Sequence, residues 1–522
     1  MAIQATGVAC PPPYAHQQQV FDLTKDEKAW ALFFEQRCGK TRPTIETVAY
    51  QYRKGAIKAL IVIADNGVHA NWATDELPNW IGSVPWRAVV YNAQKFSTKR
   101  HKAEIVDVLN FRGLKVLCIT YDAAITENGK AVLWSFLKHA AFMVADESIA
   151  CKSPTADRTK ILIKAARFAK FIRILNGTPV DRSPFDVYSQ IRFLDPDFWK
   201  VHLGIGSYGS FKAEFAEMIT CKTKPNAEGK SFEFETVKKY KHLDVLRDVL
   251  KKISSRVTRD DVFDLPPNVY GMRSYEMSPE QKRIYAELKT KLLAELGPEE
   301  TCPSCGGTGG VDYEGDHFDC LGCGGTGKVR EGRMSAVNAG VRLMRLQQVL
   351  NGYQQVDGEP LEDIPGPNRR LEALEAEIGQ TAGPWIIWGR FQRDIDKAMD
   401  LVRGMGLKAG AFDGRTPSDE RTRVRQMFQA GEIEVFIGNP GAAGKGIRLT
   451  AANSMIYYAN SFRLLHRLQS EDRAIAADVP RTFYVCDINC KGTFDDHVIK
   501  NLRSKIDVAS QVTGDRLKVW LA

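Results

Sequence analysis

The sequence predicts an α/β protein with two parallel-sheet domains, because strand-like apolar runs alternate with helical stretches in two separate parts of the chain. The runs of the first part are 56–64, 114–120, 142–147 and 171–178, and those of the last part are WIIWG, EVFIGN, SMIYYA and TFYVCDI. Such near-continuous apolar runs are typical of strands that helices cover on both faces. One large sheet is the alternative, but the long helical interruption between the two sets favours two domains.

The expected domain boundaries follow changes in composition along the chain. After Ser183 the sequence turns polar, basic and helical, and a second helical region follows the break at Leu265-Pro266-Pro267. We expect a first α/β domain at 1–182, a helical insertion at 183–270, a helical region at 271–383 with a Gly- and Cys-rich insert at 300–330, and a second α/β domain at 384–522 that ends in a C-terminal helix.

Composition indicates a globular, multi-domain protein. The chain has 522 residues, 44% of them hydrophobic, which is enough to bury large cores. Its net charge of +9 permits contact with a polyanion without demanding it. No apolar run approaches the roughly 18 residues of a membrane span, and the N-terminus lacks a basic-then-apolar signal pattern. The sequence therefore predicts a cytoplasmic protein with no membrane partner.

The tripeptide Gly39-Lys40-Thr41 is the first motif that carries chemistry. A phosphate loop between a strand and a helix needs a lysine for the phosphates and a hydroxyl for Mg²⁺, and Lys40 and Thr41 provide them. The full G-x-x-x-x-G-K-T pattern fails, because Phe34 stands in place of the first glycine and Arg37-Cys38 precede the tripeptide. We expect a loop that is less free to wrap phosphates than the usual one.

Two carboxylates complete the expected nucleotide site. Asp146 and Glu147 end the apolar run that begins at Ala141, so a strand delivers them at its C-terminal edge. Ligands bind at that edge in open α/β sheets. Asp146 is the candidate ligand of Mg²⁺, and Glu147 is the candidate group that orients or deprotonates the attacking water.

Further motifs follow in a fixed order along the chain. They are Gln17 before the first helix, Ser148 and Lys152 after the carboxylates, Thr178 in GTP, the loop Gly444-Lys445-Gly446-Ile447-Arg448-Leu449-Thr450, and Gln469-x-x-Asp472-Arg473. With these motifs the chain resembles the superfamily 2 helicases, and within them the Snf2-like ATPases. The resemblance covers nearly all of the chain. Its compact length, without added chromatin-reader segments, is typical of a prokaryotic or phage member.

The resemblance implies an ATP site between two RecA-like lobes. Lys40 would hold the β and γ phosphates, Thr41 and Asp146 the Mg²⁺, and Glu147 the water, while Arg473 would reach across from the second lobe as an arginine finger. The residues expected to bind the nucleotide are Gln17, Gly39, Lys40, Thr41, Gly444, Gly446 and Gln469. Thr178 and the glycine loop would couple this site to nucleic acid.

One departure from the family pattern concerns the second lobe. The usual second arginine, three residues after Arg473, is Ala476, and the usual histidine is Ile475. The γ-phosphate would then be held by Arg473 alone, or with help from Arg463 or Arg467. We expect Arg473 alone to suffice.

The Cys-rich insert carries two C-x-x-C pairs separated by fourteen residues. The four cysteines are Cys302, Cys305, Cys320 and Cys323, and each pair continues as Gly-Gly-Thr-Gly. Four thiolates at this spacing predict a structural Zn²⁺ site. The repeat resembles the zinc module of DnaJ-type chaperones. A redox pair or free thiols is the alternative, and His317 is a further candidate ligand. The insert would touch duplex DNA or a protein partner, or serve only to staple a hairpin.

Taken together, the motifs and the resemblance imply an ATP hydrolase that acts as a nucleic-acid motor. Double-stranded DNA is the favoured track, for a translocase or helicase in DNA replication, recombination or repair. An RNA or single-strand helicase is one alternative. A zinc-bearing nucleic-acid-binding scaffold with a degenerate ATPase is another, but intact Lys40, Asp146 and Glu147 argue against it.

Overall fold

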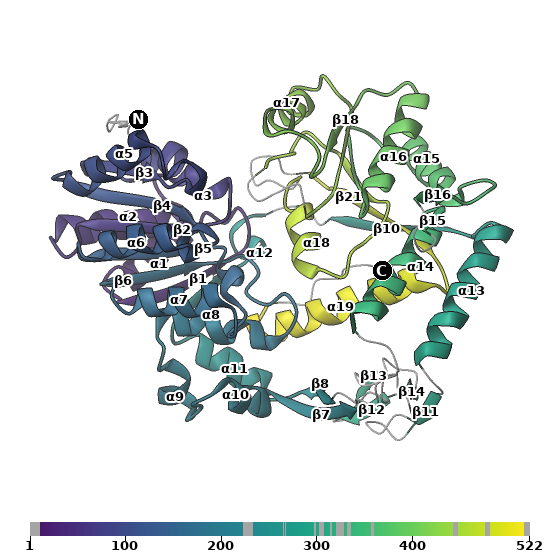
Figure 1. Cartoon of the computed structure of the whole chain (residues 1–522), viewed down its shortest axis with the longest axis horizontal. Coiled ribbons are helices and arrows are strands. Elements are labelled where there is room, and N and C mark those ends of the chain that lie inside the picture. Colours follow the sequence, from purple (N-terminus) through teal and green to yellow (C-terminus); the bar gives the residue numbers. More distant parts are fainter. Residues whose placement is uncertain are drawn as a thin grey trace.

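The strands of the chain form two large parallel sheets in separate lobes. The computed structural model describes residues 11–222, 233–264, 266, 268–296, 299–301, 307–308, 310–313, 316–319, 328–330, 336–355, 360–441, 447–474 and 481–515. Figure 1 shows the first lobe in purple and blue and the second in green and yellow. The α/β class and the two parallel sheets that the sequence predicts are confirmed.

The first lobe is built on a seven-stranded sheet whose neighbouring strands are all parallel. In spatial order its strands are β3 (Trp86–Val90), β4 (Leu114–Thr120), β2 (Ala59–Ala64), β5 (Ala141–Asp146), β6 (Phe171–Leu175), β1 (Ala29–Phe34) and β9 (Ser254–Val257). Three of the strands, β2, β4 and β6, lie within the apolar runs that the sequence shows, and β5 coincides with its run to within one residue at each end. The central strand β2 is buried along its whole length.

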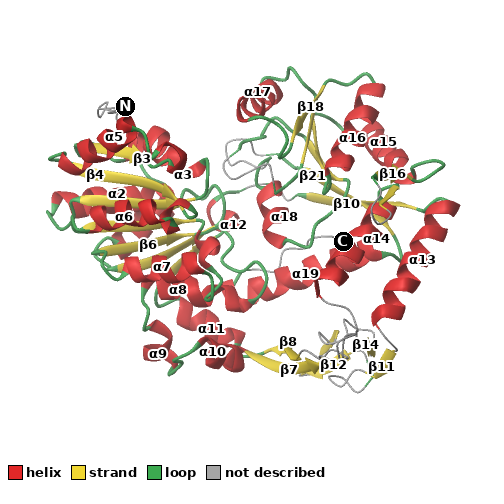
Figure 2. Ribbon diagram, in the orientation of Figure 1, coloured by secondary structure: helices red, strands yellow, loops and turns green. Residues whose placement is uncertain are grey.

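Helices cover both faces of this sheet, as Figure 2 shows. Because successive side chains of a strand point to opposite faces, Leu60 and Val62 of β2 enter one core and Ile61 and Ile63 enter the other. The first core includes residues of α1 (Ala15–Thr24), α2 (Thr41–Arg53) and α4 (Leu77–Trp80), and the second includes residues of α5 (Lys99–Asn110), α6 (Glu127–Leu137), α7 (Asp157–Ala166) and α8 (Val187–Leu194).

The second lobe is built on a six-stranded parallel sheet. Its strands in spatial order are β10 (Val269–Tyr275), β21 (Tyr484–Cys490), β20 (Ser454–Tyr457), β17 (Trp385–Trp388), β19 (Val435–Gly438) and β18 (Ala409–Phe412). Its helices are α13 (Pro279–Leu296), α14 (Ala336–Leu350), α15 (Arg369–Gln380), α16 (Gln392–Gly404), α17 (Ser418–Gln429), α18 (Leu464–Glu471) and α19 (Phe494–Thr513). Residues of α17 pack on one face, and residues of α14, α15, α16 and α19 pack on the other.

The segment 183–270, expected to be helical, also supplies strands. It contains α8, α9 (Phe198–Leu203), α10 (Tyr208–Phe215) and α11 (Leu243–Leu250), but β7 (Ala216–Lys222) and β8 (Glu233–Tyr240) form an antiparallel ribbon. Strand β9 then joins the first sheet, and β10 joins the second. Each of these two strands lies at the edge of its sheet and is less enclosed than a central strand. Neither therefore shows the near-continuous apolar run that is typical of a buried parallel strand. The second lobe therefore begins near residue 269 and not at 384.

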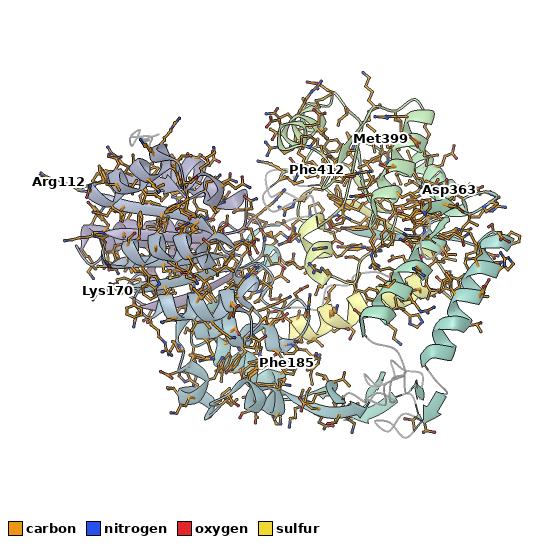
Figure 3. All side chains as sticks on the ribbon, in the orientation of Figure 1. Arg112, Lys170, Phe185, Asp363, Met399 and Phe412 are labelled. Atoms are coloured by element: carbon orange, nitrogen blue, oxygen red, sulfur yellow. The ribbon has the colours of Figure 1, made fainter. Side chains whose placement is uncertain are left out.

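Two features connect the parts of the molecule. Phe185, labelled in Figure 3 at the lower end of the first lobe, contacts Tyr208, Phe211 and Tyr240 edge to face and so anchors α10 and the ribbon. Helix α19 contributes side chains between Phe494 and Ile506 to the core of the second lobe, and Val512 near its end to the core of the first. Among the described residues, no helix combines the length and apolar character needed to cross a bilayer.

Candidate functional site

The predicted phosphate loop lies between β1, which ends at Phe34, and α2, which begins at Thr41. Gly39 has a φ of 71°, a conformation that glycine adopts without strain. A Cβ atom at this position would lie 2.2 Å from Nε2 of Gln17. Both the backbone angle and the available space therefore require glycine at position 39.

Gln17 fixes this loop through its side-chain amide. Its Nε2 donates to the carbonyl oxygen of Gly39 at 3.0 Å, and its Oε1 accepts from the backbone N–H of Tyr14 at 3.0 Å. His16 adds a second contact, 2.8 Å from its Nε2 to the carbonyl oxygen of Cys38. The amide of Gln17 is thus engaged with the protein, and its placement makes it a support of the loop.

Asp146 and Glu147 lie at the C-terminal end of β5, where the sequence places them. Both side chains are buried. Trp72 donates from Nε1 to Oδ2 of Asp146 at 3.1 Å, and the backbone N–H of Glu147 donates to Oδ1 at 3.0 Å. Glu147 has a φ of 53°, in the left-handed region. A non-glycine residue in this conformation is strained, and such strain concentrates at functional sites.

Lys40 brings the phosphate loop and the carboxylates together. Its Nζ lies 3.5 Å from Oε1 of Glu147 and 3.3 Å from Oε1 of Gln36. Gln36 in turn donates from Nε2 to Oε1 of Glu147 at 2.7 Å. Burial opposes the charge of Lys40, but Glu147 and Asp146 outweigh it, so the pKa of Lys40 is raised above its usual value. Lys40 is therefore a buried cation at neutral pH.

Arg473 approaches this group from the second lobe, two residues after α18 ends. Its side chain is buried, which lowers the pKa of the guanidinium, while the charges of Asp472 and Glu147 raise it. The backbone of Arg473 lies against the phosphate loop of the first lobe, because its carbonyl oxygen accepts from Nη2 of Arg37 at 2.7 Å. Gln469 is also buried, and its Nε2 has no hydrogen-bond partner within the described part of the chain.

The other candidate arginines of the second lobe differ in how they are held. Arg467 is buried and forms ion pairs with Asp487 at 2.5 Å and Glu471 at 2.6 Å. These contacts fix Arg467 inside its own lobe. Arg463 stands at the start of α18, and its Nη1 lies 3.4 Å from Nε2 of His466. Of the predicted nucleotide-binding residues, Gly444 and Gly446 lie outside the described residues, as do Ile475 and Ala476.

An ion-pair chain joins the two lobes beside the phosphate loop. Arg259, in the short helix α12 (Arg259–Val262), pairs through Nη1 with Asp472 at 2.8 Å and through Nε with Glu35 at 3.5 Å. Glu35 belongs to the phosphate loop, and Asp472 directly precedes Arg473. The chain of contacts thus runs from the loop, through the connecting segment, to the second lobe.

A second chain of hydrogen bonds starts at the residues after Glu147. Ser148 donates from Oγ to Oε1 of Gln190 at 2.8 Å, and Asn176 donates from Nδ2 to the same oxygen at 2.9 Å. Lys152 donates to Oδ2 of Asp181 at 2.5 Å. Oδ1 of Asp181 accepts from the backbone N–H of Leu465 in α18, at 3.0 Å. Ser148 and Lys152 thereby connect the carboxylate segment to the Asn176-Gly-Thr-Pro turn and to the second lobe.

The four cysteines of the predicted zinc site lie outside the described residues. The strands around them are described: β11 (Glu299–Thr301) pairs with β14 (Lys328–Arg330), and β12 (Gly310–Tyr313) pairs with β13 (Asp316–Asp319). Thr301 lies opposite Lys328, and Gly310 lies opposite Asp319. The pair β11–β14 joins Thr301, which directly precedes Cys302, to Lys328, which follows the second C-x-x-C pair. The pair β12–β13 joins Gly310, which follows the first C-x-x-C pair, to Asp319, which directly precedes Cys320. The two strand pairs therefore bring together residues that flank the C-x-x-C pairs. His317, in β13, lies opposite Asp312.

Several residues that shape the site carry no motif of their own. Gln36 bonds to Glu147, Trp72 bonds to Asp146, and Tyr121 donates from its hydroxyl to the carbonyl oxygen of Asp146 at 2.8 Å. In the structure Trp72 begins a π-helix (Trp72–Glu76) in the segment after β2, and π-helices are frequent at functional sites. No sequence pattern indicates the roles of Trp72, Gln36 and Tyr121, and their contacts with the two carboxylates were identified only from the structure.

Two parallel-sheet lobes, a phosphate loop with its lysine, a carboxylate pair and an arginine from the opposite lobe define the class of two-lobed α/β nucleoside triphosphatases. The model of the SNF2-related domain matches residues 23–302, and that of the helicase conserved C-terminal domain matches residues 369–477. The first match spans more than half of the 522 residues, and the chain therefore belongs to the SNF2-related family.

The chain is also similar to individual proteins. It is 23% identical over 521 residues to the SWI/SNF-related matrix-associated actin-dependent regulator of chromatin subfamily A containing DEAD/H box 1 of Xenopus tropicalis, covering 94% of this chain and 50% of that protein. It is 29% identical over 167 residues to the ATP-dependent helicase fft3 of Schizosaccharomyces pombe, covering 32% and 18%. The chain spans about half the length of the curated chromatin regulators it matches.

A solved structure, the Sulfolobus solfataricus SWI2/SNF2 ATPase core in complex with dsDNA, is 19% identical to the chain. The alignment covers 97% of this chain and 96% of that one, with a TM-score of 0.37.

Proposed function

We propose that this protein is an ATP-dependent motor that moves along nucleic acid, with double-stranded DNA as its track. The observation that carries the proposal is the arrangement of Lys40, Asp146 and Glu147 in the first lobe, with Arg473 of the second lobe held against the phosphate loop by a hydrogen bond from Arg37. Because the site contains groups from both lobes, the placement of the lobes decides whether all of its catalytic groups come together. Hydrolysis and lobe movement are then coupled.

Each residue has a role that its position supports. Lys40, a buried cation at the start of α2, holds the β and γ phosphates, and the N-terminus of α2 adds its own attraction for anions. Glu147 orients the attacking water and accepts its proton. Arg473 stabilises the negative charge that develops on the transferred phosphoryl group. A phosphate that enters the site replaces Glu147 as the anionic partner of Lys40, which leaves the carboxylate available to the water.

The residues at this position fit a magnesium ion. Thr41 offers a hydroxyl at the first position of α2, and Asp146 offers a carboxylate at the end of β5; both are the hard oxygen ligands that Mg²⁺ prefers. Bound with ATP, Mg²⁺ neutralises charge on the phosphate oxygens. Trp72 holds Oδ2 of Asp146 at 3.1 Å and so fixes the orientation of this carboxylate.

Coupling to nucleic acid follows the hydrogen-bond chain behind Glu147. Ser148 and Lys152 connect the carboxylate segment to the turn that carries Thr178 and, through Asp181, to α18. Thr178 and the glycine loop at 444–450 would contact nucleic-acid phosphates, which set position without reading bases. The net charge of +9 favours such contacts.

Double-stranded DNA is favoured over RNA because relatives that match over most of this chain are named as regulators of chromatin. The biological setting would be DNA replication, recombination or repair, in a compact prokaryotic or phage member of the family.

The buried cysteines Cys38, Cys118, Cys151, Cys486 and Cys490 are free thiols. Reduced thiols fit a cytoplasmic protein.

The test is ATP hydrolysis measured in parallel with duplex DNA, single-stranded DNA and RNA of equal length. We expect duplex DNA to stimulate turnover most, and the apparent affinity for it to fall steeply as salt increases, because phosphate contacts release counterions. Stronger stimulation by RNA or single strands would replace the duplex translocase with a helicase of the wider superfamily. No turnover with any polymer would leave the nucleic-acid-binding scaffold as the function.

We also propose that the insert at 300–330 binds one structural Zn²⁺ through Cys302, Cys305, Cys320 and Cys323. The strand pairs β11–β14 and β12–β13 support this, because they bring together the residues that flank both C-x-x-C pairs. A site of this kind contributes about 10 to 16 kcal/mol of apparent binding free energy, which is enough to order a small glycine-rich segment. Through this insert the protein would contact DNA or a protein partner.

The zinc proposal predicts the metal content of a cysteine variant. We expect the purified wild-type protein to carry about one zinc per chain and Cys305→Ser to lose most of it, because a structural site needs all four ligands. The measurement is metal quantification by mass spectrometry. Cys486→Ser, a change at a buried free thiol in β21, is the matched control and should keep the metal. Wild-type zinc content in Cys305→Ser would exclude the four-cysteine site.

A further inference from the structure

Arg37 occupies an unusual position in the phosphate loop. It is one of four non-glycine residues with positive φ in the described part of the chain, at 71°. L-residues rarely adopt this conformation, and where they do the surrounding structure must hold them in it. Glycine would fit the same backbone without strain. The chain therefore keeps an arginine where its own backbone favours glycine, which points to a function of the side chain.

The side chain of Arg37 reaches the second lobe. Its Nη2 donates to the backbone carbonyl oxygen of Arg473 at 2.7 Å. The same oxygen accepts from the backbone N–H of Leu449 at 2.9 Å. Leu449 belongs to the glycine loop, and Arg473 to the Gln469-x-x-Asp472-Arg473 motif. One carbonyl group thus joins the phosphate loop of the first lobe to two motif segments of the second.

The side chain of Arg37 lies among several other charged groups, most of them cationic. The pKa of Arg37 is lowered to about 10, chiefly by burial and also by the neighbouring Arg473, Arg448 and Arg259, while Asp472 opposes this shift. Arg37 still carries its proton at neutral pH. Several guanidinium groups near one phosphate loop repel each other, and an anion among them relieves that repulsion. A bound polyphosphate would therefore favour the arrangement in which Arg37 and Arg473 are close.

We propose that Arg37 is a positioning residue that sets the placement of Arg473 across the lobe boundary. It does so by holding the backbone of Arg473, and it acts on the reaction only through that residue. The inference rests on the proposed ATPase function. Because nucleotide binding depends on the first lobe, loss of the Arg37 contact should reduce the rate of turnover and leave ATP binding nearly unchanged.

The decisive variant is Arg37→Gly, which removes the contact and the backbone strain together. We expect kcat with saturating duplex DNA to fall about 10- to 100-fold, the effect of a small misplacement of a catalytic group, and KM for ATP to change little. The thermal unfolding midpoint should be no lower than that of the wild type, since glycine suits a φ of 71°. Arg37→Lys, which retains a cationic donor, should recover part of the lost kcat.

Two further variants separate positioning from a structural role. Ala140→Gly relieves a positive φ of 51° in the loop before β5, away from the lobe boundary, and should leave kcat unchanged. In an Arg473→Ala background, Arg37→Gly should cause no additional loss in single-turnover assays, because residues that act through one another are not additive.

The outcomes distinguish this inference from the proposed function. If the wild type hydrolyses ATP and Arg37→Gly retains wild-type kcat, Arg37 is not a positioning residue. Losses that multiply in the double variant, or a fall in kcat accompanied by a lower unfolding midpoint, would also overturn the inference. A wild type that hydrolyses no ATP with any polymer rejects the proposed function itself, and the inference with it.

Discussion

Replacing Glu147 with glutamine is expected to lower ATP turnover by about 10²- to 10⁴-fold, the range that general-base catalysis contributes, and to leave nucleotide binding nearly intact. Glutamine keeps the size of the side chain and an oxygen that can accept from Gln36 and Lys40, whose nitrogens lie 2.7 Å and 3.5 Å from Oε1 of Glu147. It removes the proton acceptor and the negative charge. Rates are compared at saturating ATP and duplex DNA, and binding is followed with a fluorescent nucleotide.

The affinity for ATP should stay the same or rise in this variant. In the wild type, Glu147 is the anionic partner of Lys40, so a phosphate competes with it for the ammonium group. The neutral amide competes less. Glu46→Gln is the matched control, because Glu46 lies on α2 of the same lobe and pairs with Arg42 at 2.9 Å, away from the carboxylates. Equal turnover of wild type and Glu147→Gln with every polymer would remove the motor function.

The positions of the carboxylates could be predicted from sequence because they depend on local pattern. The apolar run at 141–146 forms β5, is buried at every position, and delivers Asp146 and Glu147 at its C-terminal end as expected. The lysine follows from the strand that ends at Phe34 and the helix that begins at Thr41. In each case a short stretch of sequence determines both the element and the place of its functional residue.

The remaining parts of the site depend on contacts between distant segments. Strand β9 pairs with β1 although 223 positions separate Ala31 from Ser254, and its sequence SSRV has no apolar run. Arg37 contacts Arg473, 436 positions further along the chain. No periodicity in the sequence reports such pairs, because partner choice is decided by how the sheets and lobes assemble. Strand β10, which pairs with β21, was missed for the same reason.

Burial and pairing also distinguish the candidate arginines of the second lobe from one another. Arg467 and Arg473 belong to one motif region and are both buried. Arg467 is neutralised inside the second lobe by Asp487 and Glu471, and its guanidinium lies 3.6 Å from the ring centre of Tyr457. Moving it to a phosphate would leave buried carboxylates without their cation, which is costly. Arg473 instead lies at the lobe boundary, where its carbonyl oxygen accepts from Arg37 of the first lobe.

Replacing Arg473 with alanine is therefore expected to reduce ATP turnover by about 10³-fold or more, the effect attributed to an arginine finger, while ATP binding to the first lobe stays nearly intact. The comparison variant is Arg463→Ala at the start of α18, whose guanidinium lies near His466. It should retain most of the activity. Stopped-flow nucleotide binding and steady-state turnover with duplex DNA measure the two effects separately. Unchanged turnover in Arg473→Ala, together with a large loss in Arg463→Ala, would assign the finger to Arg463 instead.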